Sequence, residues 1–429
     1  MKKYRPRIAD KILQRKIASK GAVLIEGAKW CGKTTTACQI AKSVLYMQDP
    51  TQKQQNLELA EINPARLLQG KTPRLIDEWQ LAPKLWDAIR FEIDQRDEFS
   101  QFILTGSAVP ADMSEISHTG TGRISHMLMR PMSLLESEES TGSVSLKELF
   151  DGHTDINGNN NLDIDLLSFI ICRGGWPKSI DASHEVALQQ AIDYFDAIVN
   201  MDISRVDNVQ RDAEKSKRLL RSYARAIGTQ TKIPSITQDV LANELEENEN
   251  IFGKSVTINA YVNALKKIFV IEDTPAWNPN LRSKTAIRSS DTRYFTDPSI
   301  GTTALGLGPQ DLINDLNTMG LLFENLCIRD LRIYAEALDG NVYHYRDKNG
   351  LECDAVIHLR NGSYGLIEIK LGGDSRIAEG VETLNKLASN IDTSKMKAPS
   401  FKMVLTGVGN YAYKRKDDIL IVPIGCLKD

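Results

Sequence analysis

The stretch GAVLIEGAKWCGKTTTACQIAKSVLYM, residues 21–47, decides the fold of the first part of the chain. It opens with the apolar run Ala22–Ile25, breaks at a glycine, and resumes with a helical pattern. Between these halves the spacing G-x-x-x-x-G-K-T is formed by Gly27, Gly32, Lys33 and Thr34. A strand, a glycine-rich turn and a helix in this order predict a loop that holds a phosphate chain.

The spacing of this loop has a mechanism. The glycines let backbone N–H groups turn toward a phosphate, and the following helix offers its positive N-terminal end. Lys33 is expected to reach the β- and γ-phosphates of a nucleotide, and Thr34 to ligate magnesium. Trp30 could pack on the protein or cover the nucleotide, and Cys31 is interpreted as a small filler. The predicted nucleotide contacts are Gly27, Ala28, Lys29, Trp30, Cys31, Gly32, Lys33, Thr34 and Thr35.

A second acidic element follows in PRLIDEWQLAP, residues 73–83. Leu75 and Ile76 indicate a strand that ends at Asp77 and Glu78. In a nucleotide hydrolase the first acid holds magnesium and the second polarises the attacking water. We therefore predict Asp77 as a metal ligand and Glu78 as catalytic. The alternative is a strand that ends in two solvated acids.

Two further segments offer groups for the same site. The apolar run QFILTGSA, residues 101–108, ends in Thr105 and Ser107, and either could sense the γ-phosphate or simply terminate a strand. Arg123 follows a glycine-rich turn in GTGRISHMLMRP, residues 120–131. It is a candidate arginine finger, and an ordinary solvated loop arginine fits the same pattern.

A charged hairpin is predicted near the other end of the chain, in LECDAVIHLRNGSYGLIEIKL, residues 351–371. Residues two apart on a strand share a face, so Glu368 and Lys370 point the same way, and Asp354 on the neighbouring strand can meet them. Two carboxylates can bind magnesium, with Lys370 orienting a water. Glu324, on the preceding predicted helix, is a candidate outer metal ligand. The alternative is the solvated face of an ordinary hairpin.

The alternation of residue types predicts how the two faces of this hairpin differ. Cys353 and Ala355 flank Asp354, and GLIEIKL alternates in the same sense. We therefore expect one face of the hairpin to be apolar and the other to carry the charges. This expectation fits both interpretations of the hairpin.

Composition bounds the class of protein. The chain has 429 residues, which is too many for one ordinary core. Its net charge is −3, so a nucleic-acid partner would need a local basic patch. No apolar run approaches the roughly 18 residues of a membrane span. The six cysteines form no CxxC pair. We expect a cytoplasmic chain with reduced cysteines and no membrane segment.

The motifs GAKWCGKTTTA, LIDEWQ, ILTGSA and RGGWP, with YRDKNGLECDAVI and LIEIK, occur together in this order. In this combination the sequence resembles a large family of prokaryotic AAA-like ATPases that carry a C-terminal region of unknown function. The resemblance runs through nearly the whole chain. It implies ATP binding and hydrolysis with ATP and Mg²⁺ as cofactors, a middle helical region, and a C-terminal fold resembling restriction endonucleases.

We accordingly expect an α/β protein in three parts. A P-loop NTPase domain of AAA-like type would occupy residues 1–140, and a helical middle region residues 141–290. A restriction-endonuclease-like α/β domain would occupy residues 291–429. Its predicted order of helix, three strands, helix and strand is typical of that fold.

The middle region contains three predicted short helices and a predicted strand, IFVIED at 268–273, which together fit a winged helix within about 211–275. The helix near Ser255 would then read DNA, with Thr257, Asn259 and Asn263 facing outward. Winged helices also serve in protein contacts. The local basic cluster is formed by Lys215, Lys217, Arg218, Arg221 and Arg225.

Two functions remain open from the sequence. In the first, nucleotide state controls a nuclease-like domain that acts on DNA. In the second, the chain is an ATP-dependent switch or adaptor that binds a protein partner, and the C-terminal domain is a scaffold. A homo-oligomer is expected if Arg123 acts across subunits, as arginine fingers do.

Overall fold

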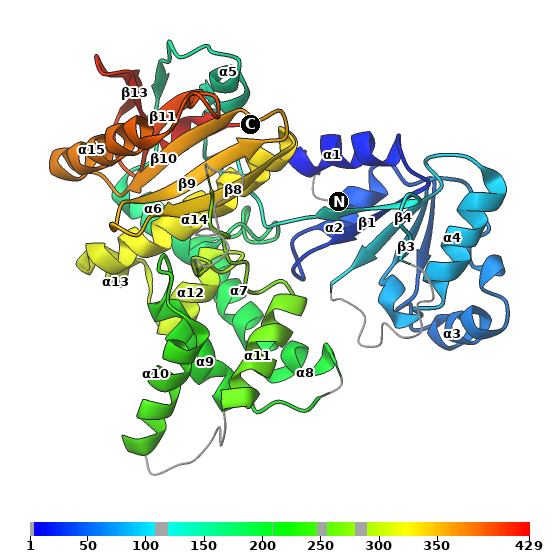
Figure 1. Cartoon of the computed structure of the whole chain (residues 1–429). Helices are drawn as coiled ribbons and strands as arrows, with labels where there is room; N and C mark the ends of the chain where they lie inside the picture. The colour runs from blue at the N-terminus through cyan, green and yellow to red at the C-terminus, as the bar shows by residue number, and fades with distance from the viewer. Residues whose placement is uncertain (1–3, 108–118, 208, 247–254, 279–289) are drawn as a thin grey trace.

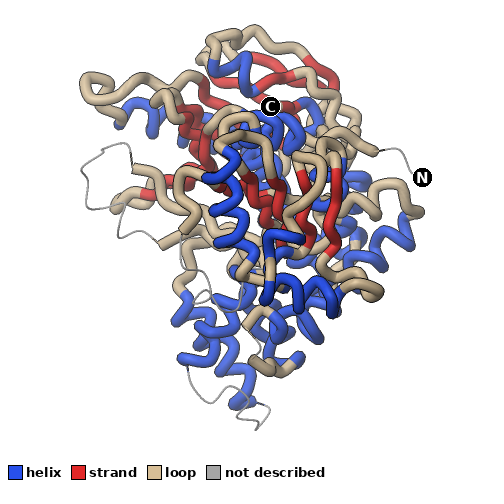
Figure 2. The backbone as a smooth tube through the Cα atoms, turned by 90° about the vertical axis from the view of Figure 1, so that its right-hand side faces the viewer, coloured by secondary structure: helices blue, strands red, loops and turns tan. Residues whose placement is uncertain are grey.

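The computed structural model describes residues 4–107, 119–207, 209–246, 255–278 and 290–429, and leaves out the side chains of 242–246 and 255–257. Figure 1 shows three regions: a first α/β region, a helical region, and a second α/β region that contains the C-terminus. In Figure 2 the helical region forms the lower part of the molecule and the strands lie above it.

The first region is a parallel sheet in the order β2-β3-β4-β1-β5. Its strands are β1 (Ala22–Glu26), β2 (Ser43–Tyr46), β3 (Arg74–Asp77), β4 (Phe102–Gly106) and β5 (Ile124–Leu128). Its helices are α1 (Ile8–Ile17), α2 (Lys33–Cys38), α3 (Lys53–Ile62) and α4 (Leu85–Arg96), with short 3₁₀ turns η1 (Pro64–Arg66) and η2 (Trp79–Leu81). The P-loop strand, the acidic strand and the strand ending in Thr105 therefore all form as predicted.

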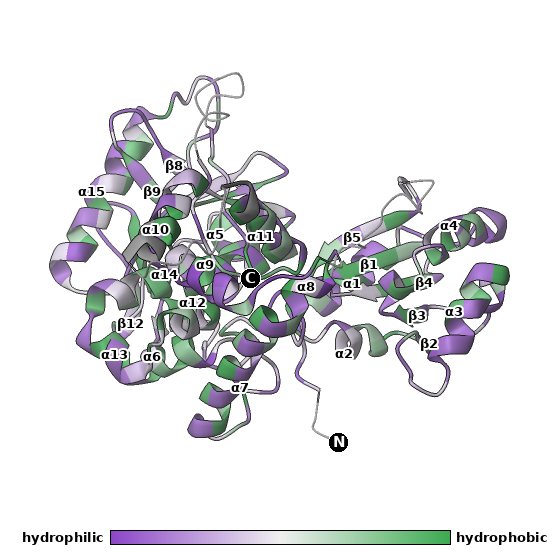
Figure 3. Ribbon diagram, turned by 90° about the horizontal axis from the view of Figure 1, so that it is seen from below, coloured by the Kyte–Doolittle hydropathy of each residue, from purple (hydrophilic) through white to green (hydrophobic). Residues whose placement is uncertain are grey.

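Both faces of this sheet are covered. Val23 and Ile25 of β1 belong to the core that includes α1 and α2, whereas Ala22 and Leu24 belong to the core that includes α3 and α4. Side chains alternate between the two faces of a strand, so a fully apolar run is what a doubly covered parallel strand requires. Figure 3 shows these hydrophobic strands flanked by helices that carry residues of both kinds.

The middle region is built from helices. They are α6 (Ile164–Arg173), α7 (His184–Ala197), α8 (Ile203–Arg205), α9 (Ala213–Arg225), α10 (Ile233–Glu246), α11 (Ser255–Lys267), α12 (Pro298–Leu305) and α13 (Pro309–Asn314). A π-helical turn, η3 (Ile198–Asp202), joins α7 to α8.

The predicted strand at 268–273 does not form. Phe269 leaves α11 with a left-handed φ of 58°, and only Ile271 within this segment makes a β-bridge, to Phe295. A second antiparallel bridge joins Thr274 to Thr292. Asn259 and Asn263 are exposed on α11, as expected, while the side chain of Thr257 lies outside the described residues. The winged helix stays a prediction.

The last region is a seven-stranded sheet in the order β7-β12-β13-β11-β10-β9-β8. Its strands are β7 (Gly158–Asn159), β8 (Gly340–Arg346), β9 (Glu352–Leu359), β10 (Tyr364–Lys370), β11 (Phe401–Thr406), β12 (Tyr411–Lys414) and β13 (Ile419–Pro423). The helices α14 (Leu316–Ala337) and α15 (Asp374–Asn390) belong to it, with a 3₁₀ turn η5 (Ile424–Cys426) near the end. The predicted order of helix, three strands, helix and strand is present.

Both faces of the β9–β10 hairpin are buried, which corrects the expectation of one apolar and one charged face. Ile357 and Ile367 belong to the core that contains α14 residues, while Val356 and Leu366 belong to the core that contains α15 residues. Helices on both sides of the sheet leave little solvated surface for charges. Glu368 is accordingly only 4% exposed.

The segment that follows the first region pairs with the end of the chain. The strand β6 (Val144–Ser145) pairs in parallel with β14 (Leu427–Lys428), and β7 pairs with β12. The short helix α5 (Leu146–Phe150) lies between β6 and β7 in the chain. Residues 144–159, which the sequence placed in the middle region, therefore lie with the C-terminal strands.

Candidate functional site

The P-loop runs from the end of β1 to the start of α2, and its backbone takes left-handed or glycine-only conformations. Gly27 has a φ of 145°, Trp30 of 66° and Gly32 of 103°. A Cβ at position 27 would lie 2.1 Å from the carbonyl oxygen of Met129, so no other residue fits there without moving that strand end. Lys33 Nζ donates to the carbonyl oxygens of Gly27 and of Ala28, each at 2.8 Å. The lysine side chain thus lies inside the loop and is bonded to the first residues of the loop.

Arg7, before α1, holds the loop from outside. Its Nη1 donates to the carbonyl of Cys31 at 2.8 Å, and its Nη2 to the carbonyl of Arg130 at 2.9 Å. Its Nε lies 3.0 Å from the carboxylate of Glu136. Cys31 is fully buried and its Sγ donates to Met129 O at 3.3 Å, which agrees with its interpretation as a filler.

Two loop side chains point to the helical region instead of to the centre of the loop. Lys29 Nζ lies 2.5 Å from Asp202 Oδ1, on the π-helical turn η3. Trp30 is 49% exposed, and its ring centroid lies 5.7 Å from that of Tyr194 on α7. Of the two interpretations of Trp30, the structure shows contact with the protein. Thr35 is exposed on α2.

Asp77, at the end of β3, gathers three polar side chains. Its Oδ1 accepts hydrogen bonds from Thr34 Oγ1 and Thr105 Oγ1, each at 2.6 Å. Its Oδ2 accepts from Gln48 Nε2 at 2.5 Å. Because β4 lies between β1 and β3 in the sheet, the carboxyl ends of these strands meet where Thr34, Thr105 and Asp77 touch. A hydroxyl and a carboxylate in contact are oxygen ligands of the kind that Mg²⁺ prefers, so these residues fit the ion.

Glu78 has a left-handed backbone, with a φ of 59°. Such a conformation is costly for a residue other than glycine and is concentrated at functional positions. The carboxylate accepts a hydrogen bond from Ser107 Oγ at 3.2 Å and another from Gln80 Nε2. Thr105 and Ser107, predicted as alternatives, therefore both join the site, one at each acid.

Arg123 is not part of this site within its own chain. It immediately precedes β5, whose first residue pairs with Ala22 at the start of β1. Arg123 therefore lies at the N-terminal ends of these strands, whereas the P-loop follows the C-terminal end of β1. A strand of five residues is roughly 16 Å long, and this length separates the two ends. Arg123 Nε pairs with Asp94 Oδ1 on α4 at 2.8 Å. The glycine-rich turn indicated an exposed arginine, but only strand register shows which edge it occupies.

Sequence reasoning missed Arg7, Gln48 and Gln80. Gln48 lies two residues after the short strand β2, and a polar residue near the carboxyl end of a parallel strand is a signal that could have been used. Gln80 lies two residues after Glu78, where a tight turn returns it to the acid. Arg7 had no such signal, because its contacts depend on the packing of α1.

The second predicted cluster is also brought together. Lys370 Nζ lies 2.7 Å from Glu368 Oε2 and 3.2 Å from Asp354 Oδ2. The same Asp354 oxygen accepts the backbone N–H of Ile369 at 2.7 Å. Glu324 Oε1, on α14, accepts from Tyr294 Oη at 2.5 Å.

The electrostatics of this cluster show an excess of buried acid. Burial, with the negative charge of Asp354, raises the pKa of Glu368 to about 8. Burial and Asp354 also raise the pKa of Glu324 well above its usual range. Burial would lower the pKa of Lys370, but Asp354 and Glu368 raise it above its ordinary value. One ammonium therefore serves more carboxyl groups than it can neutralise.

The geometry of this cluster bears on metal binding. Within the described part of the chain, no three or more His, Cys, Asp or Glu side chains form a group that could hold a metal ion. Lys370 contacts both Asp354 and Glu368 where such an ion would have to bind them. In this arrangement, Asp354, Glu368 and Glu324 do not fit a metal ion.

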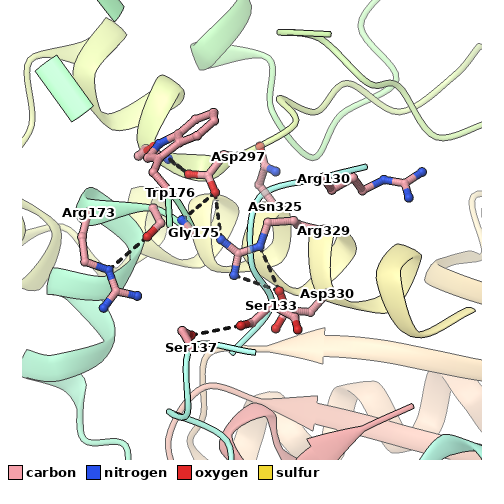
Figure 4. A network of polar contacts seen from close by, with 12 residues as sticks. Arg130, Ser133, Ser137, Arg173, Gly175, Trp176, Asp297, Asn325, Arg329 and Asp330 are labelled. Atoms are coloured by element: carbon pink, nitrogen blue, oxygen red, sulfur yellow. Dashed lines mark hydrogen bonds and ion pairs between the residues drawn. The ribbon is translucent and has the colours of Figure 1, made fainter. Parts of the chain in front are cut away.

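A buried ionic network joins the three regions (Figure 4). Arg329 of α14 is 1% exposed, and its guanidinium contacts Asp297 Oδ2 and Asp330 Oδ1, each at 2.8 Å. Asp297 also accepts the backbone N–H of Gly175, in the RGGWP turn, and Asp330 that of Leu134, after β5. Removing one partner of such a network leaves an unpaired buried charge, at a cost of about 3–5 kcal/mol.

No helix among the described residues is both long and apolar enough to cross a membrane. Two segments outside the first region match families described only as domains of unknown function: residues 164–311 match DUF8612 and residues 319–427 match DUF4143. No curated protein resembles the chain closely enough to count as a match.

Two solved structures are similar to the chain. A Walker-type ATPase of Pyrococcus abyssi is 12% identical, with a TM-score of 0.40 and coverage of 69% of this chain and 94% of that one. A signal transduction ATPase with numerous domains and a tetratricopeptide-repeat sensor, from Pyrococcus horikoshii, is 12% identical, with a TM-score of 0.22 and coverage of 79% and 50%. At TM-scores below 0.5, neither likeness establishes the fold of this chain.

Residues 19–138 match the AAA domain family. With the loop geometry above, this match makes residues 19–138 an AAA-like P-loop ATPase domain.

Proposed function

We propose that the chain binds ATP with Mg²⁺ at the P-loop and hydrolyses the ATP, and that nucleotide state controls what the rest of the chain contacts. One observation carries the proposal: Asp77 accepts hydrogen bonds from Thr34 of the P-loop and from Thr105 of β4. Three strand ends thus supply one oxygen-lined point beside a phosphate loop. This is the convergence that a nucleotide hydrolase needs.

The roles follow from these contacts. The P-loop amides and Lys33 bind the phosphates, and Lys33 exchanges its bonds to the Gly27 and Ala28 carbonyls for phosphate oxygens. Thr34 and Asp77 would hold Mg²⁺, which when bound neutralises charge on the phosphates. Glu78 orients and polarises the attacking water, and Ser107 and Gln80 hold its carboxylate in place.

The control of the other regions would begin at the loop itself. Lys29 and Trp30 contact Asp202 and Tyr194 of the helical region, so a loop that rearranges around phosphate changes those contacts. On the other side, Arg130 follows β5 and pairs with Glu272 at 2.7 Å and with Glu336 of α14 at 3.0 Å. These charged contacts link the ATPase domain to both other regions.

The test is ATP turnover by the full chain, measured as phosphate release with Mg²⁺ and with a chelator. Glu78→Gln keeps the size of the side chain and removes the carboxylate, so we expect ATP to bind but turnover to fall by about 10²-fold or more. Glu92→Gln, which alters a carboxylate paired with Arg96 on α4, is the matched control. Equal turnover in wild type and Glu78→Gln would remove Glu78 as the catalytic base.

A second candidate function is cleavage of DNA by the C-terminal domain. The observation in its favour is that Asp354, Glu368 and Lys370, predicted from an acid followed by E-x-K, lie in direct contact on neighbouring strands. Since these residues do not fit a metal ion in the present arrangement, we assign no step of cleavage to them.

A plasmid-nicking assay with Mg²⁺ or Mn²⁺ decides between this function and the adaptor. Wild type, Asp354→Ala and Lys370→Ala are compared, with and without ATP. Nicking that both substitutions abolish supports the nuclease. Plasmid that survives equally with all three proteins supports the alternative, an ATP-dependent switch or adaptor for a protein partner with a C-terminal scaffold.

A further inference from the structure

Two adjoining cavities flank the C-terminal end of α12, and neither is lined by a residue of the P-loop or of the acidic hairpin. One has a volume of about 590 Å³ and lies beside α9, and the other has a volume of about 370 Å³ and lies beside α6 and α7. Thr303 and Gly306 line both, so the two form one groove, which we call the α12 groove. Figure 1 shows α7, α9 and α12 beside one another.

One half of the α12 groove is apolar. Leu188 and Ile192 of α7 line it, together with Leu307 after α12 and Cys172 of α6. Leu188 and Ile192 are four residues apart and so lie on the same side of the helix. Ile192 is 42% exposed, which leaves a large apolar side chain open to solvent at the cavity.

The other half of the α12 groove is basic. The described lining of this half contains four basic residues of α9, Lys217, Arg218, Arg221 and Arg225, and one acid, Glu214. Arg221 lies three residues after Arg218 and four before Arg225, and Lys217 lies four before Arg221, which puts these side chains along one side of α9. Lys217 pairs with Glu214 at 3.2 Å and Arg225 with Asp239 at 2.5 Å. Arg221 is exposed, so the row keeps an excess of positive charge at the groove.

We propose that the α12 groove binds an acidic segment of a partner protein that carries apolar side chains. The apolar half receives a side chain such as Leu or Phe, and the arginine row pairs with Asp or Glu in the same segment. Burial of one such side chain supplies about 1.5–3 kcal/mol, and arginines add directional hydrogen bonds to carboxylates.

The lining favours a peptide over a nucleic acid. Single-stranded nucleic acid is held by aromatic platforms on which bases stack, and Phe195, the aromatic residue of this lining, is only 6% exposed. The apolar half offers a phosphate backbone nothing to pair with, whereas an acidic peptide with apolar side chains matches both halves. The groove contains no P-loop residue, so peptide binding there does not depend on the proposed ATPase activity.

The experiment measures binding of the full chain to an array of fluorescent 12-residue peptides that combine Asp or Glu with Leu or Phe in all registers. Peptides with Ser in place of Leu and Phe, and a single-stranded DNA of equal charge, are measured beside them. We expect binding by a subset of the acidic-apolar peptides, at least tenfold weaker binding of their Ser versions, and weaker binding at high salt.

Two variants locate the binding. Lys217→Glu/Arg221→Glu reverses the basic row, and Ile192→Ser removes the exposed apolar side chain; each should weaken binding at least tenfold. The matched control is Lys386→Glu/Arg376→Glu, which makes the same charge change on α15, and circular dichroism confirms that each variant is folded. Absence of peptide binding overturns the proposal. So does binding that Ile192→Ser leaves unchanged, or a preference for DNA.

Discussion

The P-loop site has a carboxylate at the end of a strand, and the C-terminal cluster has carboxylates on two neighbouring strands. The groups that contact these carboxylates differ between the two sites. Asp77 is bonded by neutral donors, the hydroxyls of Thr34 and Thr105 and the amide of Gln48. Asp354 and Glu368 instead share the single ammonium of Lys370. A carboxylate held by neutral donors keeps its full charge for a cation. Carboxylates paired with a lysine must first lose that partner.

The same residue types therefore prepare the two sites for a ligand to different degrees. Hydrogen bonds from neutral donors to a carboxylate contribute about 1.5–3 kcal/mol each, and a cation that replaces them gives the carboxylate a new partner. A buried ion pair is harder to open, because separation leaves a charge without a partner. The P-loop site is therefore organised to accept a cation, whereas the carboxylates of the C-terminal cluster are already paired with Lys370.

The largest expected effect is at the P-loop lysines, which differ in where they point. Lys33→Ala removes charge-assisted bonds to phosphate and should weaken ATP binding by about 10²-fold. Lys29→Ala, whose ammonium pairs with Asp202, should change ATP affinity by less than about threefold. Titration calorimetry with Mg²⁺ and a slowly hydrolysed ATP analogue checks both. A comparable loss in the two variants would show that Lys29 also reaches the nucleotide.

A smaller effect is expected from Ser107→Ala. The change removes one hydrogen bond to the Glu78 carboxylate while Gln80 keeps the other, so kcat should fall about tenfold with little change in KM. Steady-state phosphate release checks it. Ser125→Ala on β5 is the matched serine control. A change in KM alone would place Ser107 at the bound phosphate and not at the base.

The C-terminal cluster should make the stability of the protein depend on pH. The pKa of Glu368 lies at about 8 in the fold, against an ordinary value of 4.5. The fold therefore retains a proton that the unfolded chain releases, and stability falls as pH rises from 4.5 to 8. Burial and the charge of Asp354 raise this pKa, Lys370 opposes the rise, and Glu324 faces the same group.

Glu368→Gln removes that titration. The difference in Tm, variant minus wild type, should increase by about 2–4 °C between pH 5 and pH 9. Differential scanning calorimetry measures it, with Glu352→Gln, an exposed carboxylate paired with Arg346, as control. A difference that stays constant with pH would mean that Glu368 is ionised throughout and fully balanced by Lys370.

The smallest effect is expected at Arg123. It lies at the other end of the strands from the P-loop. Arg123→Ala should therefore leave ATP affinity and turnover within about twofold in dilute protein, where a weak homo-oligomer dissociates into monomers. Turnover is then followed as protein concentration rises. A loss that appears only at high concentration would show that Arg123 acts on a neighbouring subunit.

The sequence predicted the P-loop fold well because its signals are local. Gly27, Gly32 and Lys33 lie within seven residues, and the turn they require can be read from spacing alone. The closeness of Asp354, Glu368 and Lys370 was also predictable, because a hairpin fixes its own register. Arg7 could not be predicted in this way, since its contacts arise from packing between segments.

Other features needed the tertiary structure. The partners of Lys29 and Trp30, Asp202 and Tyr194, lie more than 160 residues away along the chain. The burial of both hairpin faces depends on α14 and α15 lying on opposite sides of the sheet, which alternation within the hairpin cannot report. The position of Arg123 at the N-terminal ends of the strands depends on the parallel register of β5 with β1.

The pairing of β6 with β14 has a consequence for the order in which the chain folds during synthesis. Residues 144–145 leave the ribosome soon after the ATPase domain, yet their partners are residues 427–428. The ATPase domain can fold early, while the segment that follows it must wait for the translation of nearly all the remaining chain. Premature termination before residue 427 would leave an unpaired edge and exposed apolar surface, which exposes such a truncated chain to aggregation and proteolysis.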